Sequence, residues 1–114
     1  MTTRAYVPAT RTRLADWHAA GAVPAEAERV LAPADDEDSE YDALMTAAEM
    51  ALALGPEEGR RVVVVAEAED PAAQGSLPLR CWVAVHCDVV DRAPGAAPDD
   101  DLAWFATQEI PDLF

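Results

Sequence analysis

The stretch Arg61–Ala66, with the sequence RVVVVA, decides the fold that we expect for this chain. β-Branched residues favour extended backbone, and consecutive valines place apolar side chains on both faces of a strand. Such a strand is typical of the middle of a sheet, where both faces are covered. We therefore predict that residues 61–69 form the central strand of the domain.

A second long strand should follow over residues 79–90. The intervening residues 70–79 are rich in Pro, Ala, Gly and Ser, and this loop is short enough for an antiparallel hairpin. Side chains alternate between the two faces of a strand. One face would then carry Cys81, Val83, Val85, Cys87 and Val89, and the other would carry Trp82, Ala84, His86, Asp88 and Val90.

A helix is expected over residues 39–55, on the N-terminal side of the valine strand. Ser39 is a suitable N-cap, the acidic run 35–38 favours the positive end of the helix dipole, and Gly55 followed by proline ends the helix. A metal site in the acidic run is the less favoured interpretation, because four consecutive carboxylates cannot all face one ion. The apolar residues that recur at helical spacing are Tyr41, Leu44, Met45, Ala48 and Leu52.

Shorter elements complete the N-terminal third of the chain. We expect a first strand over residues 4–8 and a short strand over residues 28–32. A helix between them would be capped by Thr10 or Thr12 and stopped by Gly21.

The closing residues 102–110 fit either a strand or a short helix, and their aromatic and β-branched side chains favour the strand. The fold class is therefore α+β. We predict one acidic domain, residues 1–114, built as a small two-layer sandwich in the order βαβαββ plus a C-terminal strand or tail. A mixed sheet would surround the central strand 61–69.

The chain is strongly acidic, with a formal net charge of −14, and its eight basic residues are all Arg. This composition is typical of a GC-rich bacterial genome. A negative surface repels phosphate backbones and anionic lipids, so we expect no direct nucleic-acid partner and no membrane partner. A minor alternative is an acidic nucleic-acid mimic that occupies a basic groove on another protein.

Several features indicate a cytoplasmic protein. No apolar run reaches the ~20 residues of a membrane span, and the first residues lack the apolar stretch of a signal peptide. Cys81 and Cys87 fall in one predicted strand at a separation of about 20 Å, which is too far for a bond between them. We interpret both as buried thiols in a reducing compartment.

Motifs that specify a reaction are absent from the sequence. It contains no glycine-rich phosphate loop, no G-x-S-x-G elbow, no C-x-x-C pair and no H-E-x-x-H. The remaining candidates are His18, His86, Cys81 and Cys87 for a transition metal or a nucleophile, and Glu67 and Glu69 with Asp88 or Asp91 for Mg²⁺ or Ca²⁺. Buried strand cysteines are usually inert, and carboxylates at a strand end usually face solvent. We therefore expect no catalytic residue, metal or cofactor, and an enzyme is the less favoured class.

The C-terminal segment is the most distinctive part of the sequence. Its last eleven residues contain five large apolar side chains: Trp104, Phe105, Ile110, Leu113 and Phe114. A free tail is normally polar, so these side chains must be covered by the domain's own core, by a second copy or by a partner. We treat the five as candidate partner-binding residues and leave completion of the core open.

Two stretches resemble a small family of uncharacterised actinobacterial proteins of unknown function. The opening YVPAT of residues 6–10 and the closing WFATQEIPDL of residues 104–113 are similar to motifs of that family. The resemblance covers most of the chain and implies the family's fold and a bacterial cytoplasmic setting, with no activity. The chain end IPDLF, residues 110–114, is also weakly similar to peptides that dock on the bacterial sliding clamp.

The function that the sequence favours is protein association without catalysis, as a homodimer or an adaptor, through the closing segment around Trp104. The alternative is a small enzyme or ligand-binding domain with a cleft between helix 39–55 and the sheet. The nucleic-acid mimic and a clamp-binding tail are minor alternatives.

Overall fold

The computed structural model describes residues 3–32, 34, 36–54, 59–69, 75–92 and 101–113. It confirms the α+β class. The elements in chain order are β1 (Thr3–Ala9), α1 (Arg11–Ala20), β2 (Ala22–Val23), β3 (Val30–Leu31), α2 (Glu37–Leu52), β4 (Val62–Ala68), β5 (Leu77–Pro78), the 3-10 helix η1 (Leu79–Cys81), β6 (Trp82–Cys87), β7 (Ala103–Phe105) and the 3-10 helix η2 (Thr107–Leu113).

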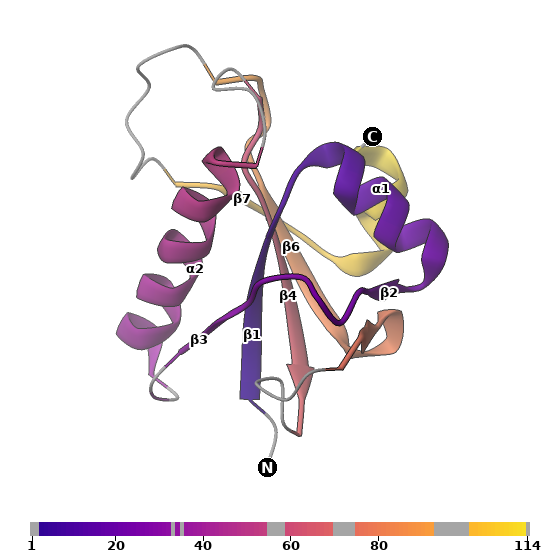
Figure 1. Ribbon diagram of the computed structural model, residues 1–114. Coiled ribbons are helices and arrows are strands. Elements are labelled where there is room, and N and C mark those ends of the chain that lie inside the picture. The colour runs from indigo at the N-terminus through magenta and orange to yellow at the C-terminus, as the bar shows by residue number, and fades with distance from the viewer. Residues whose placement is uncertain are drawn as a thin grey trace.

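The main sheet has the strand order β3-β1-β4-β6-β7, so the valine strand β4 is central as predicted. The expected mixed sheet is wrong, because every neighbouring pair in it is antiparallel. The chain runs along β1, returns through β2 and β3, and is then carried back by α2 to the end of the sheet where β1 finishes (Figure 1). β4 therefore starts at that end and runs against β1.

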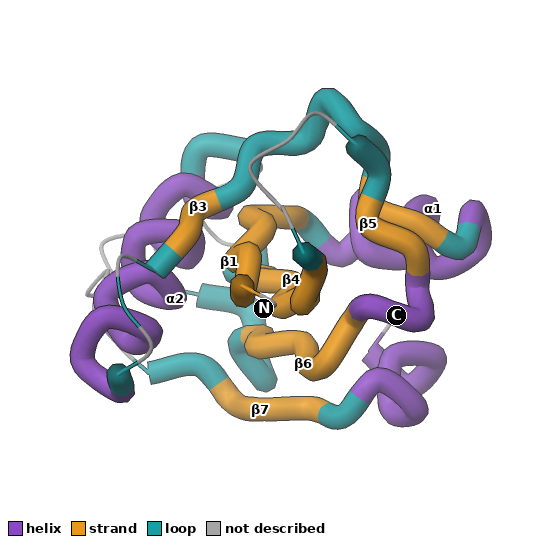
Figure 2. Tube along the Cα trace, turned by 90° about the horizontal axis from the view of Figure 1, so that it is seen from below, coloured by secondary structure: helices purple, strands orange, loops and turns teal. Residues whose placement is uncertain are grey.

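Both faces of the sheet are covered, which corrects the expected two layers to three. Figure 2 shows α2 on one side of the strands, and α1, η2 and the β2–β5 pair on the other. The α1-side core contains Val62 and Val64, and the α2-side core contains Val63 and Val65. The run of valines requires this arrangement, since a strand that is apolar on both faces needs a covering layer on each.

A bulge in β6 changes the faces that simple alternation predicts for this strand. Val65 pairs with Ala84, but Ala66 pairs with Trp82, so Val83 is an extra residue on β6. Trp82 therefore lies in the α1-side core, while Ala84 lies in the α2-side core. The prediction that Trp82 and Ala84 share a face is wrong for this reason.

Local signals at the helix ends are mostly confirmed. Thr10 caps α1 by accepting a hydrogen bond from the Arg13 amide at 3.1 Å. Gly21 ends α1 with a φ of 82°, a left-handed conformation that glycine adopts without a steric penalty. The N-cap of α2 is Asp36 rather than Ser39, because a carboxylate oxygen of Asp36 accepts the Ser39 amide at 2.8 Å.

The closing segment contains both of the alternatives considered for it. β7 pairs with β6 for three residues, and η2 then folds back over the α1-side core (Figure 1). A turn starts η2, in which a Glu109 carboxylate oxygen accepts the Ala106 amide at 2.8 Å. Among the described residues, no helix has the length and apolar character needed to cross a membrane.

Candidate functional site

An open groove of about 420 Å³ lies on the α2 side of the sheet. On this face, α2 packs on β3, β1 and β4, which are the first three strands counted from one edge of the five-stranded sheet. A helix is only about 10 Å wide, whereas strands are spaced about 4.8 Å apart, so one helix cannot cover five strands. The groove occupies the part of this face that α2 leaves open, over β6 and β7.

The floor of the groove is apolar and contains one histidine. Tyr6, Val65 and Ala84 are buried side chains of the α2-side core, and they line the groove from three neighbouring strands. His86 lies beside them on β6, opposite Trp104 of β7. Burial lowers the pKa of His86 below its ordinary value of 6.5, so the imidazole is neutral at physiological pH. It can then donate one hydrogen bond and accept another without carrying charge.

Exposed apolar side chains form the rim of the groove. Trp104 is 59% exposed, and Tyr41 and Val83 are also exposed. These three are among only five large apolar side chains that are exposed in the described part of the chain, and all three line the groove. Single exposed apolar residues are ordinary on a protein surface, but three around one groove make it a candidate interaction site.

Polar contacts connect the elements that line the groove. Arg4 of β1 donates from Nε to a Glu67 carboxylate oxygen at 2.9 Å, and its Nη1 is 3.8 Å from a Glu40 carboxylate oxygen of α2. The Tyr41 hydroxyl of α2 lies 3.1 Å from a carboxylate oxygen of Asp101, which precedes β7. These contacts fix α2 relative to the sheet, and they add acidic groups to the apolar rim.

The strand β7 is an edge strand. It pairs with β6 on one side, and no described strand pairs with its other side (Figure 2). An edge strand presents unpaired backbone amides and carbonyls that can pair with an added strand. Because β7 has only three residues, it can pair with a short segment, but it has too few free backbone groups to promote edge-to-edge aggregation.

A family model matches residues 3–114, almost the whole chain, and it describes a family of unknown function, DUF6912. The chain belongs to this family. No curated protein and no solved structure matches the chain significantly. The DUF6912 match confirms the resemblance to a domain family of unknown function, while the actinobacterial origin stays a prediction.

The structure separates the five predicted partner-binding residues of this DUF6912 domain. Ile110 and Leu113 are buried in the α1-side core, and Phe105 is half-buried against it, so these three side chains contribute to the domain's own core. Trp104 points to the opposite face of β7 and is exposed in the groove. Phe114 lies outside the described residues. Leu113, which also belongs to the stretch that is weakly similar to clamp-binding peptides, is buried here.

Sequence patterns alone missed Tyr41 and Val83 as groove residues. Tyr41 was assigned to the apolar stripe of helix 39–55, but the buried stripe of α2 consists of alanines at positions 43, 47, 48 and 51. Val83 is exposed because of the bulge in β6. Tyr41 precedes the buried stripe by two residues, so a stricter helical periodicity would have placed it at the edge of the helix.

The carboxylates considered for Mg²⁺ or Ca²⁺ are not together. Glu67 is near the end of β4, whereas Asp88 follows β6, whose last residue Cys87 pairs with Val62 at the start of β4. Asp88 therefore lies opposite Arg61, six residues before Glu67 on the antiparallel partner, so Glu67 and Asp88 are about 20 Å apart at the strand rise. In the described part of the chain, no three His, Cys, Asp or Glu side chains form a group that could hold a metal ion.

Cys87 is a buried thiol in the α1-side core, and we expect it to be unreactive. Burial raises its pKa from 9.0 to about 11. A rise of two pKa units lowers the thiolate fraction about 100-fold at neutral pH, and the thiolate is the reactive form. Alkylation of Cys87 by iodoacetamide near pH ~8 should therefore be at least ~100-fold slower in the folded protein than in urea. Mass spectrometry of peptides containing Cys87 measures both rates, and equal rates would contradict the buried position.

Proposed function

We propose that this DUF6912 protein is a non-catalytic association module that binds an extended segment of a partner protein in the groove between α2 and β7. The observation that carries the proposal is the exposed Trp104 on an edge strand beside an apolar groove. Trp is enriched among residues that dominate binding energy, because its large ring buries much apolar area at low entropic cost. An edge strand supplies backbone hydrogen bonds to the same segment.

The charge around the groove favours a basic partner segment. Glu37 and Glu40 of α2 line the groove, and Arg4 is its only cationic side chain among the described lining residues. Arg4 is already within ion-pair distance of Glu40 and Glu67. The net charge of −14 also disfavours face-to-face contact of two copies, whereas it attracts a positively charged segment. We therefore assign the groove to a segment that alternates apolar and basic residues, so that the apolar side chains enter the groove.

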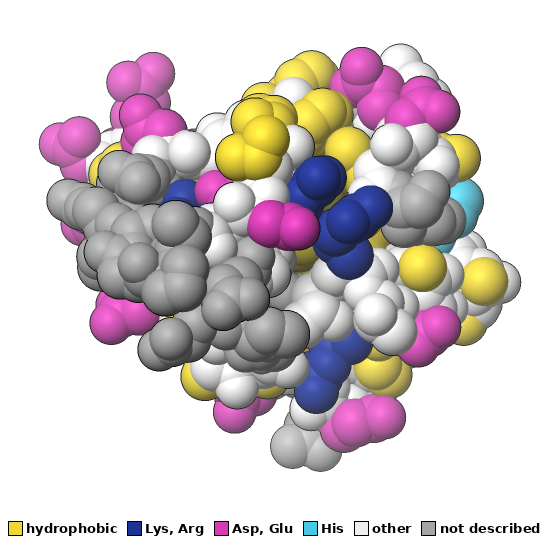
Figure 3. Space-filling view, turned by 90° about the horizontal axis from the view of Figure 1, so that it is seen from above, with side chains coloured by type: hydrophobic (Ala, Val, Ile, Leu, Met, Phe, Trp, Pro, Cys, Tyr) yellow, Lys and Arg dark blue, Asp and Glu magenta, His cyan; other side chains and the backbone are white. Residues whose placement is uncertain are grey.

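A partner of this kind accounts for the charge better than nucleic-acid mimicry does. Among the described side chains that are visible in Figure 3, arginine and apolar side chains separate the acidic ones, so these form no continuous acidic surface. We also infer a cytoplasmic setting, where the thiols of Cys81 and Cys87 stay free.

Substitution of Trp104 tests the association proposal. The probe is a synthetic peptide that alternates Lys and Val, with a peptide that alternates Glu and Val as its charge control. We expect the basic peptide to shift the backbone amide NMR signals of residues 103–105, and Trp104→Ala to weaken its binding at least ~10-fold, about 1.4 kcal/mol. Val89→Ala is the matched control, because Val89 is as exposed as Trp104 but lies outside the groove.

Two results would contradict the proposal. Equal affinity of wild type and Trp104→Ala for the basic peptide would show that the attraction is only a general charge effect. A wild-type dimer in light scattering that becomes a monomer on Trp104→Ala substitution would make the occupant a second copy of this chain. Trp104 is largely exposed, so the substitution should leave the fold intact, and the unfolding midpoint checks this.

The second candidate function is a small ligand-binding domain that uses the same groove. It is favoured by the neutral, half-buried His86, which can exchange hydrogen bonds with a polar group in an otherwise apolar floor. His86→Ala should then abolish binding of such a ligand, whereas a partner segment held by Trp104 and the β7 edge should tolerate it.

A further inference from the structure

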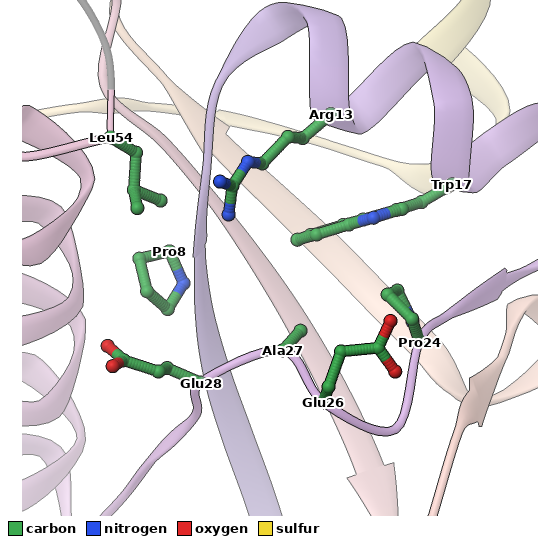
Figure 4. Close-up of a pocket in the computed structure, with 8 residues that line it drawn as sticks. All are labelled: Pro8, Arg13, Trp17, Pro24, Glu26, Ala27, Glu28 and Leu54. Atoms are coloured by element: carbon green, nitrogen blue, oxygen red, sulfur yellow. The ribbon is translucent and has the colours of Figure 1, made fainter.

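A second cavity, of about 400 Å³, lies apart from the groove and shares no residue with it. Figure 4 shows its walls: Pro8 at the end of β1, Arg13 and Trp17 of α1, the segment 24–28 between β2 and β3, and Leu54 after α2. These parts are far apart in the sequence. Its volume is in the range of pockets that hold small organic ligands.

The inner surface of this cavity is apolar. Trp17 is only 8% exposed, and its indole forms one wall, while Pro8 is buried at the end of β1. Pro24, Ala27 and Leu54 are partly exposed and complete the apolar surface. A planar indole flanked by prolines suits the flat or aliphatic body of a small molecule.

Opposite charges lie on two sides of this apolar surface. The Arg13 guanidinium points into the space between Pro8 and Trp17, and the Glu26 carboxylate lies beside Pro24, on the opposite side of Trp17 from Arg13 (Figure 4). Within the described part of the chain, neither side chain has an ion-pair partner. A third charged side chain, Glu28, also lines the cavity, but its carboxylate points away from Trp17 (Figure 4). Arg13 and Glu26, which carry opposite charges, can each bind a complementary group of one ligand.

The wall that carries Glu26 is held in place by Arg29. The Arg29 guanidinium donates to the backbone carbonyls of Pro24, Ala25 and Ala27 at 3.3 to 3.4 Å, and to that of Gly75 at 3.1 Å. The Ala27 amide also donates to the Pro24 carbonyl at 3.1 Å, which closes a turn. A wall that is already ordered does not need to be ordered by the ligand, so less affinity is lost on binding.

We propose that this cavity binds a small zwitterion with an apolar body, such as an amino acid or a dipeptide. Arg13 pairs with the ligand carboxylate, Glu26 pairs with its ammonium group, and the apolar part packs on Trp17. The overall charge supports this class, since a protein of net charge −14 repels an anionic ligand, whereas a zwitterion carries no net charge. The site is independent of the association groove, so each proposal can fail without the other.

Titrations followed by NMR test the charge pairing. The probes are L-phenylalanine, the dipeptide alanyl-phenylalanine, and two analogues that carry one charge each, 3-phenylpropionate and 2-phenylethylamine. We expect saturable shifts of the Trp17 indole signal and of residues 24–28 with a zwitterionic probe, with a Kd of about 1 mM or below. Each single-charge analogue should bind at least ~10-fold more weakly, because one charged side chain is left unpaired.

Single substitutions test which side chain binds each charged group of the ligand. Arg13→Gln and Glu26→Gln should each weaken binding of the zwitterion about 10-fold. Arg80→Gln, at an exposed position on η1, should leave it unchanged. All three positions are exposed, so the variants should fold, and the unfolding midpoint checks this.

The relative affinities of the probes distinguish the two ligand classes, amino acids and short peptides. Tighter binding of L-phenylalanine assigns the site to amino acids, and tighter binding of the dipeptide assigns it to short peptides. Absence of saturable shifts up to about 10 mM of every probe overturns the proposal. Equal affinity for a single-charge analogue, or no effect of both Arg13→Gln and Glu26→Gln, also overturns it.

Discussion

Replacement of Asp88 by asparagine should lower the free energy of unfolding by about 3–5 kcal/mol. Arg61 precedes β4, and its side chain is 0% exposed. Its Nε and Nη2 atoms donate to the two carboxylate oxygens of Asp88 at 2.9 and 2.8 Å, and its backbone amide donates at 2.9 Å. Arg92 Nη1 lies 4.0 Å from the same carboxylate. Neutralising this carboxylate would remove a shared anionic partner from two buried guanidinium groups, which costs far more than the net value of the pair.

The same carboxylate predicts a loss of stability in acid. Burial alone would raise the pKa of Asp88, but the hydrogen bonds from Arg61 and the charges of Arg61 and Arg92 outweigh burial and hold the pKa below 3.8. The folded state therefore binds fewer protons at this site than the unfolded state as the pH falls. The contribution of Asp88 to stability is complete above the unfolded pKa and is lost as the pH falls through the folded pKa.

Urea unfolding of wild type and Asp88→Asn measures both effects. The difference between the two proteins should be largest at neutral pH and should shrink in acid below about pH 4. Asp91→Asn is the control, since its side chain is 71% exposed and pairs with Arg60 at the surface, and it should change stability by less than about 0.5 kcal/mol. A neutral-pH loss from Asp88→Asn as small as that of the control would refute the importance of the buried pair.

Local patterns were enough to predict the main elements of the fold. The valine run predicted the central strand, and Thr10 and Gly21 predicted the two ends of α1. Each of these signals determines the backbone conformation of only a few neighbouring residues. These signals do not depend on which segment packs against which. They are therefore visible in the sequence before the fold is known.

Features that depend on distant contacts were not predicted. β2 and β5 have two residues each, too few for a periodic pattern, and their pairing is supported by the Leu79 amide, which donates to the Gly21 carbonyl at 2.8 Å. The bulge in β6 accompanies burial of Trp82, whose indole N–H donates to the Leu77 carbonyl at 3.0 Å. Both arrangements join segments that only the folded chain brings together.

The same division applies to the candidate sites. Trp104 was predicted as a partner-binding residue because an aromatic chain end is unusual in composition alone. The cavity around Arg13 and Trp17 was not predicted, because it also needs Pro8, Leu54 and the segment 24–28, which the sequence does not bring together. Charged side chains are rarely buried, and the pairing of Arg61 with Asp88, which only the folded chain brings together, explains the burial of Arg61.

Ile110→Ala should be the most destabilising change in the closing segment, with a loss of about 2–5 kcal/mol in the free energy of unfolding. Ile110 is 0% exposed in the α1-side core, and η2, which carries it, packs against β6 and α1. Alanine would leave a cavity that the short η2 can fill only by moving toward the sheet, which would disturb its packing on β6 and α1. Gln108→Ala is the matched control on the same 3-10 helix, because Gln108 is exposed and should cost less than about 0.5 kcal/mol.

Urea unfolding and light scattering together show what the closing segment does. A large loss of stability in Ile110→Ala, with the same oligomeric state as wild type, means that η2 completes the core. Trp104 is then the large apolar side chain of residues 101–113 that stays exposed. An Ile110→Ala protein as stable as Gln108→Ala would contradict the buried position of Ile110. Because Ile110 and Trp104 point to opposite sides of the sheet, stability should respond to the first substitution and association to the second, which separates the two roles of one short segment.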